Sequence, residues 1–279
     1  MRASVNSIFN AANSSDWSGF LSLLDEHLDV TLRDDQGQTL LLALIRNSSL
    51  DEDGLPRAVR PDERIFDCLE AVLRLGADPN VGDQMLSQFP LHEAVLRGAY
   101  GIVQSLLRHR ADPNRRLQLE THFGTDSGYD EAPLHIAAGL GLTEIARLLC
   151  EHGATIDIGG YAGQTPLHVA AKEGRDEVLQ LLLTQGANIQ TGCHGTLVGR
   201  FMSGETPLHV AVAFLRTSTV QTLLSHGASV DTRDASGRTP LDILRDKRYR
   251  VKWVLGREFP NEDVAIIERS LQLQLQKHP

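Results

Sequence analysis

The chain has 279 residues, of which 41% are hydrophobic and only 5% aromatic, and this length corresponds to one large domain or two ordinary ones. Its formal net charge of −9 disfavours nucleic acid as a partner, because binding to a phosphate backbone requires a positively charged surface. The three cysteines include no CxxC pair, so no disulfide framework is predicted. The opening residues lack the apolar core of a secretory signal, and no run of 18 apolar residues could span a membrane. These features predict a cytoplasmic protein.

A motif of the type Thr-Pro-Leu-His recurs along the chain. Successive copies are 50, 43, 33, 41 and 33 residues apart, which indicates a 33-residue period with 17, 10 and 8 additional residues in three places. A Gly-Ala pair 21 residues after the Thr position, as in Gly186-Ala187 after Thr165, supports the same register. The aligned leucines of the motif are Leu41, Leu91, Leu134, Leu167, Leu208 and Leu241.

Each period has the local signals of two helices joined by a turn. Thr165 is typical of a helix N-cap, and Pro166 fits the first turn, where its missing N–H costs nothing. Gly174 is placed to end this short helix in a left-handed conformation. A second helix with the apolar stripe Val178–Leu183 follows, and Gly186 ends it before a β-turn finger. One unit alone cannot bury these apolar faces, so we expect the units to stack.

Several copies are close to a known pattern: TPLHVAA, LLLTQGANI, LLSHGASVD and LRLGADPN. Through these segments the chain resembles the ankyrin-repeat family over about residues 6–255. The resemblance implies an all-α solenoid of about seven helix-turn-helix units with β-turn fingers and a C-terminal capping helix. It also implies that the usual function is to bind another protein. Finally, it implies a structural role, hydrogen bonding near the finger and the capping Thr, for the histidines of the motif, which are His92, His135, His168 and His209.

The expected organisation in chain order has three parts. Residues 1–38 are predicted to form a degenerate N-terminal capping repeat, and residues 39–238 the ankyrin repeats. Residues 239–279 are predicted to form a C-terminal capping repeat and an amphipathic helix with Val264, Ile267, Leu271 and Leu275 on one face. The basic segment 245–257 is interpreted as a solvated cap helix, and a nuclear-localisation or phosphate-contacting patch is the alternative.

Three insertions interrupt the period, near residues 47–63, 115–131 and 190–205. The first falls between the two helices of the second unit and is predicted to project away from the fingers, as a surface loop or as a docking element. The other two lengthen fingers on the same edge of the stack. They either fold towards the concave groove and cover part of it, or form flexible hairpins.

Two units depart from the pattern of the others. In the sixth unit Leu215 takes the place of the helix-ending glycine, and because a left-handed leucine is costly, we expect the helix to continue or the turn to be rebuilt. In the second unit Leu42 replaces the histidine and Leu44-Ile45 replaces the alanine pair. Regular stacking is in doubt at both places.

Binding of a protein partner through the groove and the two long fingers is the favoured hypothesis. The mixed apolar and charged character of the groove suits a peptide or a helix better than a single ion. Glu93 stands where other units have an apolar residue, so its carboxylate is either exposed at the groove edge or perturbed by its neighbours. The proposed binding residues are Arg97, Leu140, Tyr161, Lys172, Glu173, Arg200 and Phe214.

The alternative hypothesis is a small-molecule enzyme or carrier, for example a cyclase, isomerase or dehydratase of secondary metabolism, with a pocket under the long fingers. It needs only a few convergent acid and base groups, for which the candidates are Glu93, His122, Asp126, Tyr129 and His194. No sequence motif supports a metal or another cofactor, since Cys193-His194 has no second ligand pair at metal-site spacing. A closed pocket under the fingers would favour this hypothesis, and fingers that point into solvent would disfavour it.

Overall fold

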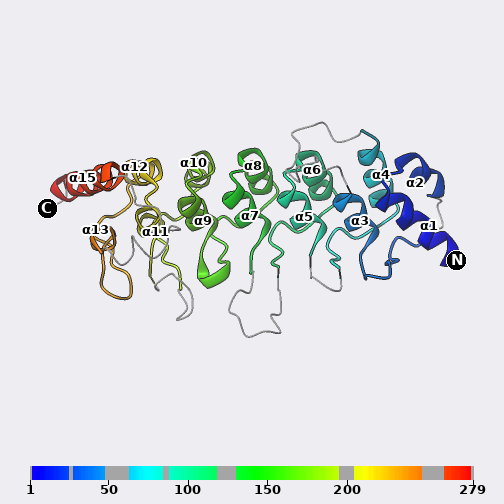
Figure 1. The fold of residues 1–279 in the computed structure, drawn as a ribbon, viewed down its shortest axis with the longest axis horizontal. Coiled ribbons are helices and arrows are strands. Elements are labelled where there is room, and N and C mark those ends of the chain that lie inside the picture. The colour runs from blue at the N-terminus through cyan, green and yellow to red at the C-terminus, as the bar shows by residue number, and fades with distance from the viewer. Residues whose placement is uncertain are drawn as a thin grey trace.

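The computed structural model describes residues 2–24, 28–47, 63–83, 88–117, 130–194, 204–246 and 261–277. Within these ranges the chain is helical and has no β-strand, and an isolated bridge joins Arg33 and Thr39. Antiparallel helix pairs stack side by side into an elongated array, and the connections between pairs extend from one edge as fingers (Figure 1). The predicted all-α solenoid is therefore confirmed.

The helices fall into pairs that follow the repeat. We number the units one to seven by these pairs, and the last unit combines α13 with α15. The bounds are α1 Arg2–Asn13, α2 Trp17–Leu23, α3 Leu40–Arg46, α4 Glu63–Arg74, α5 Pro90–Leu96, α6 Tyr100–Arg108, α7 Pro133–Leu140, α8 Thr143–Glu151, α9 Pro166–Glu173, α10 Asp176–Thr184, α11 Pro207–Ala213, α12 Thr217–Ser225, α13 Pro240–Arg245 and α15 Asn261–Lys277, with a short 3₁₀ turn at Tyr161–Gly163.

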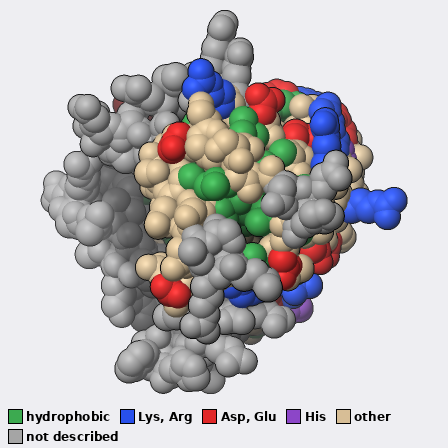
Figure 2. Space-filling view, turned by 90° about the vertical axis from the view of Figure 1, so that its right-hand side faces the viewer, with side chains coloured by type: hydrophobic (Ala, Val, Ile, Leu, Met, Phe, Trp, Pro, Cys, Tyr) green, Lys and Arg blue, Asp and Glu red, His purple; other side chains and the backbone are tan. Residues whose placement is uncertain are grey.

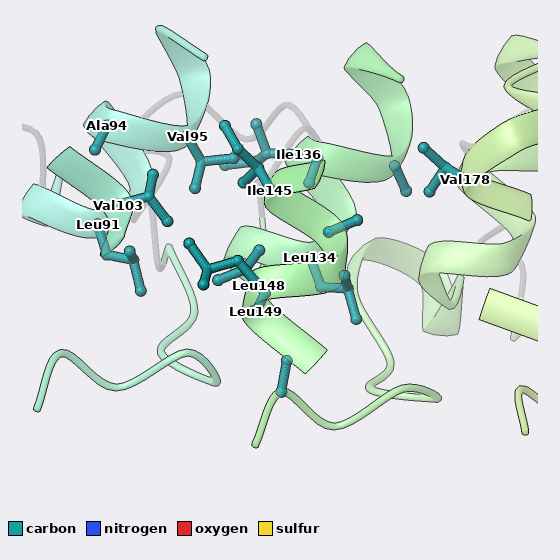
Figure 3. Close-up of a cluster of buried hydrophobic side chains, with 14 of the residues drawn as sticks. Leu91, Ala94, Val95, Val103, Leu134, Ile136, Ile145, Leu148, Leu149 and Val178 are labelled. Atoms are coloured by element: carbon teal, nitrogen blue, oxygen red, sulfur yellow. The ribbon is translucent and has the colours of Figure 1, made fainter. Parts of the chain in front are cut away.

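The core is one continuous layer between the two rows of helices. Six inner helices each pack against the inner helix of the next unit, and the outer helices do the same. These six are α1, α3, α5, α7, α9 and α11. Alanines without exposed surface, such as Ala137 and Ala170, let neighbouring inner helices approach closely. Figure 3 shows Val95 of α5 packed towards Ile136 of α7 and Ile145 of α8, so that each apolar cluster spans two units.

The ends of the stack are closed in different ways. Figure 2 views the N-terminal end, where small apolar areas lie among polar ones. Helix α1 buries Ile8 and Ala12 but exposes Asn6 and Asn10. At the other end α15 packs on α12 and α13, and its residues Ile267 and Leu271 are fully buried. The predicted amphipathic capping helix is thus confirmed, because one face of α15 replaces the next repeat.

Two sequence-based expectations about irregular units were wrong. Leu215 keeps the turn of the other units, with a left-handed φ of 52°, instead of extending α11. Its side chain is only 9% exposed, so burial of the leucine offsets the backbone cost. In unit two, all residues from Leu40 to Ile45 are buried and α3 packs against both α1 and α5. Stacking therefore continues through both units.

Arg110 also has a left-handed φ, of 68°, and stands where other units have glycine, but its side chain is exposed. Since no burial offsets the backbone cost, Arg110→Gly is expected to raise the free energy of unfolding by about 1 kcal/mol. Urea unfolding followed by circular dichroism measures the change. Arg108→Gly, in the last turn of α6, is the control and is expected to destabilise by about 0.5–1 kcal/mol. An Arg110→Gly variant that unfolds at lower urea than the wild type contradicts this account.

Two other statements concern the C-terminal region and membranes. Most of the basic segment 245–257 lies outside the described residues, so its two interpretations stay as stated. Arg245 itself forms an ion pair with Glu268 of α15, with 2.9 Å between Nη2 and Oε1. Among the helices that the structure describes, none is both long enough and apolar enough to cross a membrane.

Candidate functional site

The histidines of the repeated motif are buried links between consecutive units. The Nδ1 atom of His168 accepts from the backbone N–H of Thr165 at 3.2 Å, so the ring proton is on Nε2, which donates to the Glu205 carbonyl at 3.0 Å. His135 and His209 repeat the arrangement with the carbonyls of Gln164 and Arg238. Each imidazole thus joins its own helix start to the finger of the next unit.

Burial determines the protonation state of these rings. It lowers the pKa of His168 and of His92 to about 4, and it also lowers the pKa values of His135 and His209. The four rings are therefore neutral at pH 7. Unit three differs at its cap: Phe89 stands where units five and six have Thr, and among the described residues the buried Nδ1 of His92 has no hydrogen-bond partner.

The predicted binding residues of the groove lie at the C-terminal ends of the inner helices. Leu140 at the end of α7 is 46% exposed, and Lys172 and Glu173 end α9 with 3.4 Å between Nζ and Oε1. Phe214 follows α11, and the Lys172 ammonium lies 5.8 Å from the centre of its ring. Tyr161 lies apart from them, in the 3₁₀ turn of the finger between units four and five.

Leu96 belongs to the same surface but was missed in the sequence. It is 43% exposed at the end of α5, five residues after the aligned leucine, where α9 has Lys172. Aligning that position across all units would have found it.

Glu93 is buried and ion-paired, so the alternative of an exposed carboxylate was wrong. It is only 8% exposed, and its Oε1 accepts from Nε of Arg97 at 2.6 Å. Its Oε2 lies 3.9 Å from Nε of Arg46, whose guanidinium also pairs with Asp83 at 2.6 Å. The Arg97 guanidinium at the groove is therefore half-buried against Glu93 and does not extend into solvent. The carboxylate that replaces an apolar residue in α5 is held by arginines from two units.

Because this pairing is buried, Glu93→Ala is expected to destabilise the chain by about 2 kcal/mol, since it leaves Arg97 without its partner carboxylate. Glu173→Ala is the matched control. Its ion pair with Lys172 is 36% exposed on both sides, and its loss is expected to change stability by less than about 0.5 kcal/mol. Chemical unfolding of both variants measures the difference. Equal effects of the two substitutions would show that burial of the Glu93 pairing is unimportant.

Sequence models of the ankyrin-repeat family match three overlapping stretches. "Ankyrin repeat" matches residues 88–116, "Ankyrin repeats (3 copies)" matches 115–193, and "Ankyrin repeats (many copies)" matches 167–224. The chain is an ankyrin-repeat protein. The crystal structure of the human ASB11 ankyrin repeat domain is similar to it, with 22% identity, a TM-score of 0.66 and coverage of 96% of each chain. That likeness shows the ankyrin fold, and no curated protein matches the sequence.

The acid–base candidates of the alternative hypothesis are only partly described. His122, Asp126 and Tyr129, like the proposed binding residue Arg200, lie outside the described residues. His194 lies in the finger that precedes the sixth ankyrin repeat. Its backbone N–H donates to the Ala162 carbonyl at 2.6 Å. Its imidazole lies so close to Gly163 that a Cβ added to this glycine would be 2.5 Å from the imidazole Cδ2. This finger thus packs against its neighbour.

A hollow of about 330 Å³ lies between the fourth and fifth ankyrin repeats, on the edge opposite the fingers. It is lined by Leu140, Gly141 and residues 174–178, at the turns between inner and outer helices. The enzyme hypothesis expects a pocket under the fingers, and this hollow lies elsewhere. Within the described ranges, no three His, Cys, Asp or Glu side chains converge as metal ligands would.

Proposed function

We propose that this ankyrin-repeat chain is a binding protein that holds another protein in the groove formed by its inner helices and fingers. Its ankyrin repeats support a role as a protein-interaction scaffold. Leu96 and Leu140, each more than 40% exposed, carry the proposal for this surface. Large apolar side chains at this exposure on adjacent inner helices provide area that a partner can bury.

Charged groups beside these leucines provide specificity for the partner. Lys172 and Glu173 are about one-third exposed and lie one unit beyond Leu140. Phe214, one unit further, is half-buried under the Lys172 ammonium. A groove that alternates apolar and paired charged side chains is suited to a peptide or helix that presents the complementary pattern.

A partner captured from an extract of the source cells, then purified, tests the proposal. The triple variant Lys172→Ala, Glu173→Ala, Phe214→Ala is expected to bind it at least about tenfold more weakly than the wild type, as measured by calorimetry. The control is Gln180→Ala with Gln221→Ala, because both glutamines are exposed on outer helices away from the groove. If the folded triple variant binds as tightly as the wild type, the groove is not the binding surface.

The enzyme hypothesis is not proposed for this chain. Of its candidate residues only Glu93 and His194 are described. Glu93 is paired with arginines in unit three, whereas His194 packs on a finger two units further along. No observation brings an acid and a base together.

A further inference from the structure

The residue two positions before each inner helix from α3 to α13, next to the N-cap, lies at the base of a finger beside the groove. Only two of these residues are carboxylates, and they are in different environments. Glu205 is 2% exposed and lies 3.7 Å from Nη2 of Arg238, so it has a counter-charge. Among the described residues, no arginine forms an ion pair with Glu131. The residues at this position are Gln38, Gln88, Glu131, Gln164, Glu205 and Arg238.

Glu131 is half-buried, and its negative charge is not neutralised by an ion pair within the described ranges. Among the described residues, its carboxylate forms no hydrogen bond and no ion pair. Burial raises its pKa, and the charge of Lys172 lowers it by a smaller amount. The Lys172 ammonium is itself 3.4 Å from Glu173, so two carboxylates share one cation. This part of the groove therefore has a net charge of about −1 and an incompletely neutralised carboxylate.

An opening in the groove floor lies on the same inner helix. Gly139 of α7 occupies the position where α5 has Leu96 and α9 has Lys172. A Cβ added at Gly139 would have one atom of another residue within 4 Å, Cγ1 of Val169, at a distance of 3.2 Å. The groove floor therefore lacks a side chain at this position, between the exposed Leu96 of α5 and Lys172 of α9. Val169 closes one side of this opening so tightly that a Cβ at Gly139 would require it to shift. Pro133 and Gly139 of α7 are about 9 Å apart along the helix axis, and the two non-helical residues Glu131 and Ala132 precede Pro133.

We propose that units four and five take a partner segment whose lysine or arginine pairs with Glu131 and whose large apolar side chain fills the opening at Gly139. The inference rests on the proposed function, because it names the chemistry of the partner in the same groove. The unpaired carboxylate selects a cation, and a separation of about 9 Å or more fits residues three or four apart in an extended chain, or two turns apart in a helix. An acidic segment is excluded by the net negative charge of the site.

A library of random 12-residue peptides displayed on phage is the probe, selected on the whole protein. Enriched peptides are expected to contain a lysine or arginine together with Leu, Ile, Phe or Trp at the stated separation. The affinity of a synthetic peptide is then measured by fluorescence anisotropy. Glu131→Gln and Gly139→Leu are each expected to weaken it about tenfold. The control Glu177→Gln, which removes an exposed charge on α10, is expected to change it less than about twofold.

A double-mutant cycle separates direct pairing from an indirect effect. Changing the basic residue of the peptide to glutamine is expected to weaken binding to the wild type but not to Glu131→Gln. Loss of folding does not account for this result, because glutamine removes the cost of burying a charge. Glu131→Gln is therefore expected to melt at or above the temperature of the wild type at pH 7.

Three results overturn the inference. Peptides that require Lys172, Glu173 and Phe214 but show no coupling between their basic residue and Glu131 overturn it and leave the proposed function in place. Peptides that bind the triple variant as tightly as the wild type overturn both. A selection that yields groove-dependent peptides without basic residues also overturns the choice of a cationic partner.

Discussion

Replacement of His168 by alanine is expected to lower the free energy of unfolding by about 4 kcal/mol. The ring is fully buried, and its loss leaves the Thr165 N–H and the Glu205 carbonyl without their partner in a closed environment. The cavity adds to this cost. The imidazole also joins units five and six, so the effect extends beyond one helix.

Urea unfolding followed by circular dichroism measures the effect of this substitution. His226→Ala is the control, because His226 is exposed at the end of α12 and its loss is expected to change stability by less than about 0.5 kcal/mol. A loss below about 1 kcal/mol for His168→Ala would show that the imidazole does not hold the two units together.

Acidification from pH 7 to pH 5 is expected to destabilise the fold by about 4 kcal/mol through His92 and His168. Burial lowers the pKa of both rings to about 4, whereas an unfolded histidine has a pKa of about 6.5. Between these values the unfolded chain binds protons that the folded chain does not. The stabilisation is therefore complete above about pH 6.5 and is lost as the pH falls towards 4, at about 1.4 kcal/mol per unit for each ring.

The urea midpoint measured at half-unit steps between pH 7.5 and pH 5 checks this dependence. His168→Gln removes one of the two rings whose pKa is about 4, so its midpoint is expected to fall less over this interval than that of the wild type. A midpoint that does not change between pH 7 and pH 5 would mean that the rings are protonated without cost, which contradicts their burial.

The helices could be predicted because their signals are local. Thr165, Pro166 and Gly174 define α9 within ten residues, and the structure places α9 at Pro166–Glu173. Leu215 shows the limit of such reasoning. The segment shows that a left-handed leucine has a local cost, but the burial of its side chain depends on neighbouring units and is invisible in the segment itself.

The groove was harder to predict than the helices because its properties depend on pairs far apart in the chain. Glu93 could be recognised as unusual, but its ion pairs with Arg46 and Arg97 fix a buried carboxylate that the sequence left open. Glu131 and Glu205 occupy the same position in their repeats and differ in burial and in whether an arginine reaches them. That difference follows from side-chain geometry and not from the period.

The histidine position of the seventh unit holds Asp242. Its carboxylate accepts from the N–H of Thr239 at 2.9 Å and bonds to its hydroxyl at 2.8 Å, so it completes the cap of its own helix. A histidine there would have a second nitrogen in need of a carbonyl from a further repeat, whereas a carboxylate has no such requirement. In the part of the chain that the structure describes, Asp242 thus bonds only within its own unit, whereas the histidines of the preceding units also bond to the next one. It stands in the last unit, where α15 takes the place of a further repeat.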